Sequence, residues 1–357
     1  MTSLGATPRN EPKPGIKRIN LALQGGGAHG AFTWGVLDRL LEDERIEIEA
    51  ISGASAGAIN GVVVAEGLAE GGRVKARQQL SNFWESVSNA LASSPLNSNL
   101  WTQFLPPWLR DMSPKFDASS MASSMAFDFF ASMPSAFQLS PSGYNPLRDI
   151  IEREVNFERV RACTTMQLFV AATRVDTGRL HVFTGQNVTL DACLASACLP
   201  TLYKAVEIDG IAYWDGGYTA NPPLTPFIKH CGSDDVMVVQ INPARRADVP
   251  TSGGDILHRL NEITFNASLL REIDAISFVN DLIDAGSLKD QGFRRMHLHR
   301  LGGGVTFENL ANSSKFNGDW TFLKSLRDAG RLETDAWLKA HFDHIGRKST
   351  MELVEST

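Results

Sequence analysis

The chain has 357 residues, of which 43% are hydrophobic and 21% are charged, a composition that excludes a disordered or fibrous protein. Lys and Arg total 34 against 40 Asp and Glu, and the resulting net charge of −6 argues against a nucleic-acid-binding protein, whose domains usually carry a basic surplus. A chain of this length can bury a full core, so neither disulfides nor a structural metal is needed to stabilise it.

The amino-terminal segment and the cysteines point to a cytoplasmic protein. Residues 1–15 are polar and rich in Pro and Gly, lack the apolar stretch of a secretory signal peptide, and are expected to be flexible. The uncharged stretch over residues 129–147 contains three prolines and is therefore not a membrane span. The four cysteines lack the spacing of a zinc site, and we expect them to be reduced and to lie in the core, with no metal bound.

The first 70 residues predict alternating strands and helices. Alternating apolar residues indicate a strand over Lys17–Gln24, which runs into a glycine cluster, and a helix follows over Ala28–Leu41. A second strand over Ile46–Ser52 is followed by a helix of small apolar residues over Ala56–Ala69. This order is typical of a parallel sheet covered on both faces. We therefore expect an α/β fold, a three-layer α/β/α sandwich with a mostly parallel central sheet.

The composition changes over Ser86–Asn145. These 60 residues contain only five charged residues but two Trp, six Phe and four Met. Apolar surface of this kind marks a patch that faces lipid or a partner. We expect an insertion that forms a lid or wall over an acyl-chain groove and contacts a lipid or membrane-surface substrate. The alternative is an insertion that packs on its own core.

Regular patterning resumes after the insertion. An Asp–Gly pair at 209–210 between alternating apolar runs predicts a tight hairpin. The other expected elements are a helix from Pro146 through Ile151 and strands over Leu168–Thr173, Arg179–Thr184, Val236–Gln240 and Arg295–His299. We expect a single domain over residues 16–345, with the insertion at 86–145, and a C-terminal tail over 346–357.

Residues 53–57, with the sequence GASAG, form a GxSxG motif between a predicted strand and a predicted helix. Gly53 and Gly57 are the small neighbours that a sharp strand-to-helix turn needs, and the turn exposes the hydroxyl of Ser55. The amino terminus of the following helix favours the alkoxide-like form of that oxygen. The motif predicts Ser55 as a nucleophile.

Residues 25–30, with the sequence GGGAHG, follow the first strand and admit two interpretations. Gly25, Gly27 and Gly30 match the dinucleotide-binding pattern GxGxxG. However, the second strand ends in the serine turn, without the acidic residue that would bind a ribose. The amides of Gly25, Gly26, Gly27 and Ala28 could instead form an oxyanion hole that faces Ser55.

Trp214, Asp215, Gly216 and Gly217 follow the predicted hairpin, and on their own they could simply form a turn. Together with the two earlier motifs, the chain resembles the patatin-like phospholipase family, in which GGGxxG, GxSxG and DGG occur in this order. The segment Ala195–Pro200 is also similar to the family's segment before the DGG hairpin. The resemblance covers roughly residues 16–224.

The resemblance implies a catalytic dyad in which Ser55 is the nucleophile and Asp215 is its base, without a histidine. It implies that amides around Gly25, Gly26 and Gly27 hold the oxyanion, and it implies neither a metal nor an organic cofactor. The expected substrates are phospholipids or lysophospholipids. A carboxylate serves as such a base only where burial raises its basicity toward neutral pH.

His29 departs from the family, whose members often carry Arg or Lys at this position of the glycine loop. A histidine that titrates near neutrality would give the activity a pH-dependent limb. The alternative is a solvent-facing histidine in the first helical turn.

Two further function classes stay open from the sequence. One is a Ser–His–Asp esterase that takes its base from a later histidine, with the candidates His230, His258, His297 and His299. The other is a nucleotide-binding or membrane-tethering module that keeps the fold without hydrolysis. We expect a protein that acts in the cytoplasm or peripherally at membranes, and the oligomeric state is not predicted.

Overall fold

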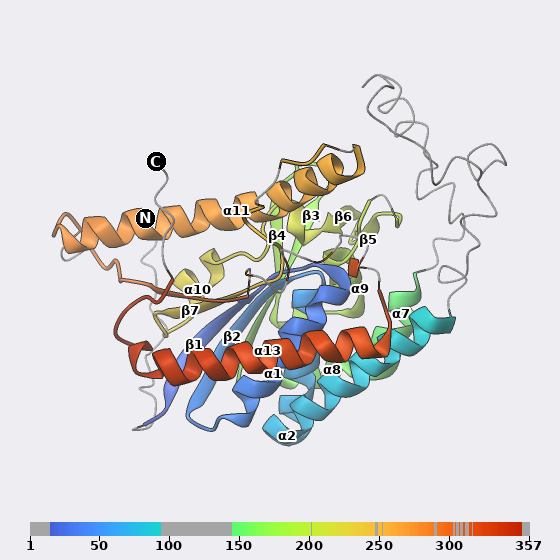
Figure 1. Cartoon of the computed structure of the whole chain (residues 1–357), viewed down its shortest axis with the longest axis horizontal. Coiled ribbons are helices and arrows are strands. Elements are labelled where there is room, and N and C mark those ends of the chain that lie inside the picture. The colour runs from blue at the N-terminus through green and yellow to red at the C-terminus, as the bar shows by residue number, and fades with distance from the viewer. Residues whose placement is uncertain are drawn as a thin grey trace.

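The computed structural model describes residues 15–93, 145–200, 202–246, 249–251, 253–288, 291–302, 304, 307, 310, 314–315 and 317–351. Its centre is a sheet with the strand order β5-β6-β3-β2-β1-β7-β8, in which β4 also pairs with β3 (Figure 1). The strands are β1 (Lys17–Leu23), β2 (Ile46–Ala54), β3 (Gln167–Arg174), β4 (Leu180–Thr184), β5 (Val206–Ile208), β6 (Ile211–Asp215), β7 (Asp235–Gln240) and β8 (His297–Gly302).

Strand direction divides the sheet into two parts. Strands β3, β2, β1, β7 and β8 are parallel to their neighbours in this order. Strands β4 and β6 run antiparallel to β3, and β5 runs antiparallel to β6. The parallel part is the one that carries the strand–helix turns, so their loops meet at its carboxyl edge.

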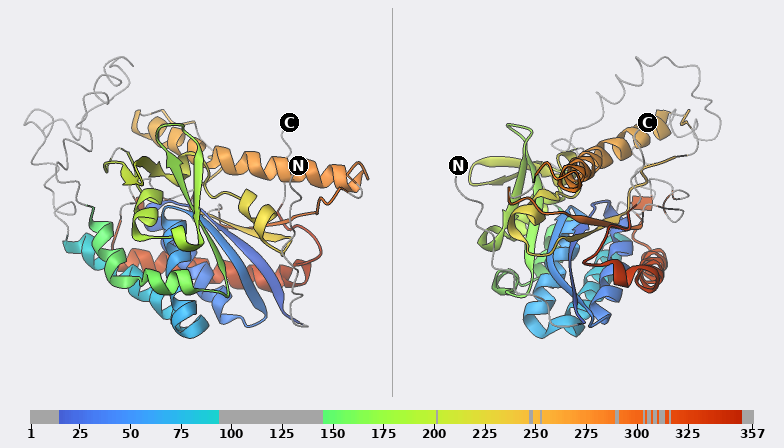
Figure 2. Two further views of the ribbon diagram at one scale, coloured as in Figure 1. Left: turned by 180° about the vertical axis from the view of Figure 1, so that it is seen from behind. Right: turned by 90° about the vertical axis from the view of Figure 1, so that its left-hand side faces the viewer.

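Helices cover both faces of the sheet (Figures 1 and 2). One face packs α1 (Gly30–Glu42), α2 (Ala56–Ser93), α7 (Pro146–Glu154), α8 (Phe157–Ala162), α9 (Leu190–Ser196) and α13 (Trp320–His341). The other face packs α10 (Thr225–His230) and α11 (Gly253–Asp284). The expected three-layer α/β/α architecture is therefore confirmed.

The alternation of side chains along β1 shows why the sheet needs two helical layers. Leu21 and Leu23 point into the core cluster that includes α1 and α13, while Ala22 between them belongs to the cluster formed with Leu269 of α11. Because successive side chains of a strand point to opposite faces, an uninterrupted apolar strand must be covered on both sides.

Two expected boundaries differ from the structure. Helix α2 is interrupted at Gly71 and Gly72, whose backbone is not helical, and a second helical part then runs to Ser93. The first residues of the predicted insertion therefore belong to a helix, and residues 94–144, which hold the rest of the predicted lid, lie outside the described residues. At the other end, the segment expected to begin a tail is bonded to the sheet: the amides of Thr350 and Met351 donate to the carbonyl of Leu298 at 3.0 Å.

Among the helices that the structure describes, none combines the length and the apolarity that crossing a membrane requires. The four cysteines are free thiols; three of them are buried and Cys163 is half-buried.

Candidate active site

The register of β3 brings the GxSxG serine and the DGG aspartate to the same place. Ala54, the last residue of β2, pairs with Ala171 of β3. Asp215, the last residue of β6, pairs with the next residue of β3, Ala172. Strand β4 pairs with residues 169–173 of β3 and so occupies one edge of that strand. Strands β2 and β6 pair with overlapping or adjacent residues of β3 and must therefore both lie along its other edge. Ser55, directly after β2, therefore meets Asp215 at the junction of the parallel and antiparallel parts of the sheet.

Ser55 lies in the sharp turn that the sequence predicts. Its φ of 51° is in the left-handed region, which an L-residue rarely adopts and which is often associated with function. A Cβ at Gly53 would lie 2.5 Å from the amide nitrogen of Ala58, so the turn leaves no room for a side chain there. The Ser55 amide donates to the Oγ of Ser196 at 2.9 Å, a contact that fixes the turn and that the sequence analysis did not foresee.

Asp215 is almost completely buried, with 1% of its surface exposed. Its Oδ1 accepts the Gly217 amide at 2.7 Å, and the Ser55 side chain lies close enough to influence the pKa of the carboxyl. Burial raises the pKa of the Asp215 carboxyl to about 7, although the hydrogen bond from Gly217 and the Ser55 side chain oppose this shift. A carboxyl group with this pKa exists in both protonation states near neutral pH, as a general base requires.

The backbone around Asp215 is also fixed. Its amide donates to the carbonyl of Cys198 at 2.8 Å, and its carbonyl accepts the hydroxyl of Thr173 at 2.8 Å. The carboxylate is thus held by β3 and by the segment after α9 before any substrate binds, which reduces the reorganisation needed during a reaction.

The glycine cluster packs directly against Ser55. A Cβ at Gly25 would lie 2.7 Å from the Cβ of Ser55, and a Cβ at Gly26 would lie 2.9 Å from Ile241. Gly27 has a φ of 59°, and a Cβ there would collide with the carbonyl of Lys315. Each of these positions therefore requires glycine for a packing reason of its own.

The amides of the cluster differ in their availability for an oxyanion. The Gly25 amide already donates to Oδ1 of Asn221 at 2.7 Å, which differs from its expected role as an oxyanion donor. Within the described part of the chain, the amides of Gly26 and Gly27 have no hydrogen-bond acceptor. The structure therefore leaves Gly26, Gly27 and Ala28 as the candidate donors.

Polar side chains from distant segments hold the glycine cluster in place. Asn242 donates from Nδ2 to the Gly25 carbonyl at 2.7 Å, and its Oδ1 accepts Nζ of Lys315 at 2.8 Å. Oε1 of Gln24 accepts the amides of Ile241 and Asn242, each at 3.0 Å. We call Gln24, Asn242 and Lys315 together with Asn221 the glycine-loop clamp. The sequence analysis missed these residues, because lone polar residues some 200 positions apart give no signal of their own.

His29 lies elsewhere than expected. It is buried rather than solvent-facing, with Nε2 2.7 Å from Oγ of Ser314 and its ring 5.5 Å from that of Phe307. Burial, aided by the positive charge of Lys315, lowers the pKa of His29 to about 4. The expectation that His29 titrates near neutrality is therefore wrong, because a distant segment covers the imidazole and excludes its charged form.

Three of the four histidines considered as a base lie at the other end of the sheet from Ser55. His299 is hydrogen-bonded through Nε2 to Asp235, the first residue of β7, at 2.9 Å. His297 begins β8, and the carbonyl of His230 accepts a hydrogen bond from the first residue of β3. All three histidines therefore lie near the amino ends of β3, β7 and β8, which run parallel to β2. Ser55, in contrast, follows the carboxyl end of β2.

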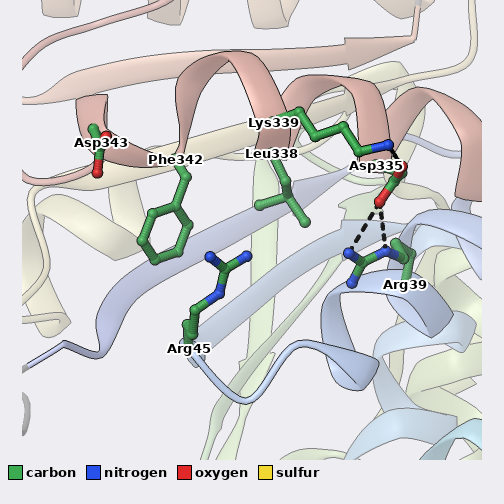
Figure 3. Close-up of a pocket in the computed structure, with 7 residues that line it drawn as sticks. All are labelled: Arg39, Arg45, Asp335, Leu338, Lys339, Phe342 and Asp343. Atoms are coloured by element: carbon green, nitrogen blue, oxygen red, sulfur yellow. Dashed lines mark hydrogen bonds and ion pairs between the residues drawn. The ribbon is translucent and has the colours of Figure 1, made fainter.

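A cavity of about 430 Å³ lies at the amino ends of the strands, outside this site (Figure 3). Arg45, directly before β2, and Arg39, which is paired with Asp335 at 3.0 Å, take part in its lining. The other lining residues are Leu338, Lys339, Phe342 and Asp343. In the described part of the chain, no group of three or more His, Cys, Asp or Glu side chains could hold a metal ion.

Residues 21–228 match the model of the patatin-like phospholipase family, which is more than half of the chain. The chain belongs to the patatin-like phospholipase family. The matched residues of this patatin-like chain contain Ser55, Asp215 and the whole glycine cluster, and the match supports lipid acyl hydrolysis as the class of function. No curated protein matches the chain.

Solved structures give only weak likenesses to the patatin-like chain. VipD from Legionella pneumophila aligns with a TM-score of 0.38 and 14% identity, over 92% of this chain and 67% of its own. The type III effector protein ExoU aligns with a TM-score of 0.35 and 16% identity, over 92% of this chain and 53% of the ExoU chain. A chain of the ExoU–SpcU complex of the type III secretion system of Pseudomonas aeruginosa aligns with a TM-score of 0.32 and 18% identity, over 96% of this chain and 64% of its own length. This chain thus spans about half to two thirds of their lengths, and these likenesses add nothing to the family assignment.

Proposed function

We propose that this protein hydrolyses carboxylic esters of phospholipids or lysophospholipids through a Ser55–Asp215 dyad and an acyl-enzyme intermediate. The observation that carries the proposal is the position of the buried Asp215 carboxyl beside Ser55, where β2 and β6 meet on one edge of β3. Burial raises the pKa of this carboxyl to about 7. Family membership supports a lipid ester as the substrate.

Formation of the acyl-enzyme is the first half of the reaction. Ser55 Oγ attacks the ester carbonyl carbon while its proton passes to the Asp215 carboxylate. The carbonyl oxygen becomes an oxyanion, which accepts hydrogen bonds from the amides of Gly26, Gly27 and Ala28. The tetrahedral intermediate then collapses, the bond to the alcohol oxygen breaks, and the alcohol leaves with the proton that Asp215 returns.

Hydrolysis of the acyl-enzyme regenerates the dyad. A water molecule gives a proton to Asp215 and attacks the acyl carbon, and the same amides stabilise the second oxyanion. Ser55 recovers its proton as the fatty acid leaves. One carboxyl group serves both halves, because a base with a pKa near 7 also returns its proton readily at neutral pH.

The test is turnover of a phospholipid and of a soluble chromogenic ester by purified variants. We expect both Ser55→Ala and Asp215→Asn to lower kcat by about 10⁴-fold or more, since residues that act as one unit are lost together. His230→Ala and His299→Ala serve as controls and keep turnover. Full activity in Asp215→Asn, combined with its loss in either histidine variant, would instead support the Ser–His–Asp alternative.

A further inference from the structure

Two hydrogen bonds in series connect a lysine ammonium to the peptide group between Gly25 and Gly26. Nζ of Lys315 donates to Oδ1 of Asn242 at 2.8 Å, and Nδ2 of Asn242 donates to the Gly25 carbonyl at 2.7 Å. An ammonium group can only donate, so the atom of Asn242 that faces it must be the oxygen, and the nitrogen must face Gly25. We call Lys315, Asn242 and the Gly25–Gly26 peptide group the lysine relay.

The Gly25–Gly26 peptide group joins the relay to the candidate oxyanion site. This peptide is trans, so the Gly25 carbonyl and the Gly26 amide belong to one planar group and point in opposite directions. The carbonyl faces Asn242, and the amide has no acceptor among the residues that the structure describes. Gly25 packs against Ser55, since a Cβ at this glycine would lie 2.7 Å from the Cβ of the serine. The relay therefore ends on an available donor in the loop that contacts the nucleophile.

The ammonium of Lys315 has no carboxylate partner within the described part of the chain. The lysine is half-buried, and its one hydrogen bond there is the bond to Asn242. Burial lowers the pKa of the ammonium, and the negative charge of Glu262 opposes this shift. Glu262 is itself paired with Arg246 at 2.6 Å and with Arg259 at 3.1 Å. The one described hydrogen-bond partner of this ammonium thus leads to the glycine cluster.

A positive charge at one end of such a relay strengthens the donor at its other end. Hydrogen bonds in series polarise one another, so an amide that accepts a bond at its oxygen donates more strongly from its nitrogen. The relay contains two amides in series, namely the side chain of Asn242 and the Gly25–Gly26 peptide group. Its first hydrogen bond comes from a charged donor, and such bonds are stronger than those between neutral groups. We therefore expect the Gly26 amide to donate more strongly than an ordinary peptide amide.

We propose that Lys315 is a positioning residue that strengthens the Gly26 amide as an oxyanion donor, and that it acts through Asn242 without touching the substrate. The proposal rests on the proposed function, because it needs an oxyanion to form at Ser55. It gives the charge of Lys315 a role in the rate of the reaction, beyond the role of the glycine-loop clamp in holding the loop.

The test is steady-state kinetics of Lys315→Met on an uncharged soluble ester, which offers no anionic group to the ammonium. Methionine is an unbranched side chain without a charge or a donor, whereas Lys315→Arg keeps both. The matched control is Lys17→Met. Lys17 is also half-buried, and its ammonium donates to the carbonyl of Ile345 at 2.8 Å from the first residue of β1, at the other end of the sheet. Melting temperatures verify that each variant is folded.

We expect Lys315→Met to lower kcat by about tenfold and to leave KM nearly unchanged, because the oxyanion forms only in the transition state. The loss should be smaller than the roughly 10²–10³-fold cost of removing an oxyanion donor, since the Gly26 amide stays in place. Lys315→Arg should keep most of the wild-type kcat, and Lys17→Met should keep all of it. Unchanged kcat in Lys315→Met, a loss confined to KM, or equal losses in Lys315→Met and Lys315→Arg would overturn the proposal.

A double-mutant cycle tests whether Lys315 acts through Asn242. The relay is already broken in Asn242→Ala, so adding Lys315→Met to that variant should change kcat by less than about twofold. A second loss as large as the one that Lys315→Met causes in the wild type would overturn the relay. Ser55→Ala is assayed alongside and tests the dyad separately. If Ser55→Ala keeps turnover, the proposed function fails; if it loses turnover while Lys315→Met keeps its kcat, only the role of Lys315 fails.

Discussion

Asp215 can accept a proton only when it is ionised, and its burial sets the pH at which ionisation occurs. With a pKa of about 7, its basic form is lost as the pH falls below neutrality. We expect kcat/KM to fall by about tenfold per pH unit below about 7 and to level off above it, because kcat/KM follows the free enzyme. A pH series with a soluble ester measures this. A flat profile from about pH 5 upward would contradict the assignment of Asp215 as the base.

His29 adds no ionisation near neutrality, because its pKa of about 4 keeps the imidazole uncharged there. We expect the profile of His29→Ala between about pH 6 and 8 to keep the midpoint of the wild type. Its absolute rate can fall, because the ring supports the glycine cluster through Ser314 and Phe307. A midpoint shifted by His29→Ala, measured in the same buffers, would show that the imidazole titrates with the reaction.

At the scale of elements, the glycine loop depends on a clamp from other parts of the fold. Asn242 binds the Gly25 carbonyl and Lys315, so Asn242→Ala leaves two buried polar groups without their partner. We expect kcat to fall by about 10–100-fold, because a small displacement of the oxyanion donors suffices for such a loss. Steady-state kinetics on a soluble ester checks this.

Asn280→Ala is the matched control for the clamp. Asn280 is a buried asparagine of α11 that exchanges two hydrogen bonds with Met296, away from the glycine cluster. Both variants should lose stability by about 1–3 kcal/mol. Equal kcat values for the two variants would show that the clamp contributes stability alone.

Local patterns predicted most of the elements that build the site. The Asp–Gly pair forms the hairpin between β5 and β6, with φ of 52° at Asp209 and 75° at Gly210, because the turn demands residues that tolerate the left-handed region. The strand before Ser55 and the helix after it follow from apolar periodicity and small residues. Ser196 and Asn221 were not predicted as part of the site, because their roles depend on contacts across the fold.

At the scale of the molecule, the sheet turns three separate motifs into one site. Parallel strands put the glycine cluster and the serine turn at one edge, which strand order alone predicted. The meeting of Ser55 with Asp215 required the pairing of β6 with β3, on the edge that β2 leaves free beyond Ala171. Sequence periodicity cannot reveal this pairing. From the residues alone the aspartate could be read as a turn former, and its proposed catalytic role came from the family resemblance.

The buried carboxyl of Asp215 makes the whole domain less stable as the pH rises. Between its ordinary value of 3.8 and its folded pKa of about 7, the unfolded chain releases this proton while the folded chain retains it. The stability contributed by the protonated group is present below pH 3.8 and is lost as the pH rises to about 7. In Asp215→Asn the side chain no longer ionises, so this pH-dependent loss of stability disappears. The asparagine side-chain oxygen can still accept the hydrogen bond from the Gly217 amide.

We therefore expect Asp215→Asn to melt on the order of 5 °C above the wild type near pH 8, with a smaller gain toward pH 4. Calorimetry across this range measures the difference, and Ser55→Ala serves as a control that leaves the carboxyl in place. A lower Tm for Asp215→Asn at every pH would show that the ionised carboxylate stabilises the fold.

The central claim is that Ser55 is the nucleophile and that Asp215 activates it. Labelling with a fluorophosphonate, followed by mass spectrometry of the digested protein, tests this most directly, because the reagent modifies only an activated serine. The account predicts one modified peptide, with the label on Ser55, and strongly slowed labelling in Asp215→Asn. A label on another serine, or undiminished labelling of Ser55→Ala, would contradict it.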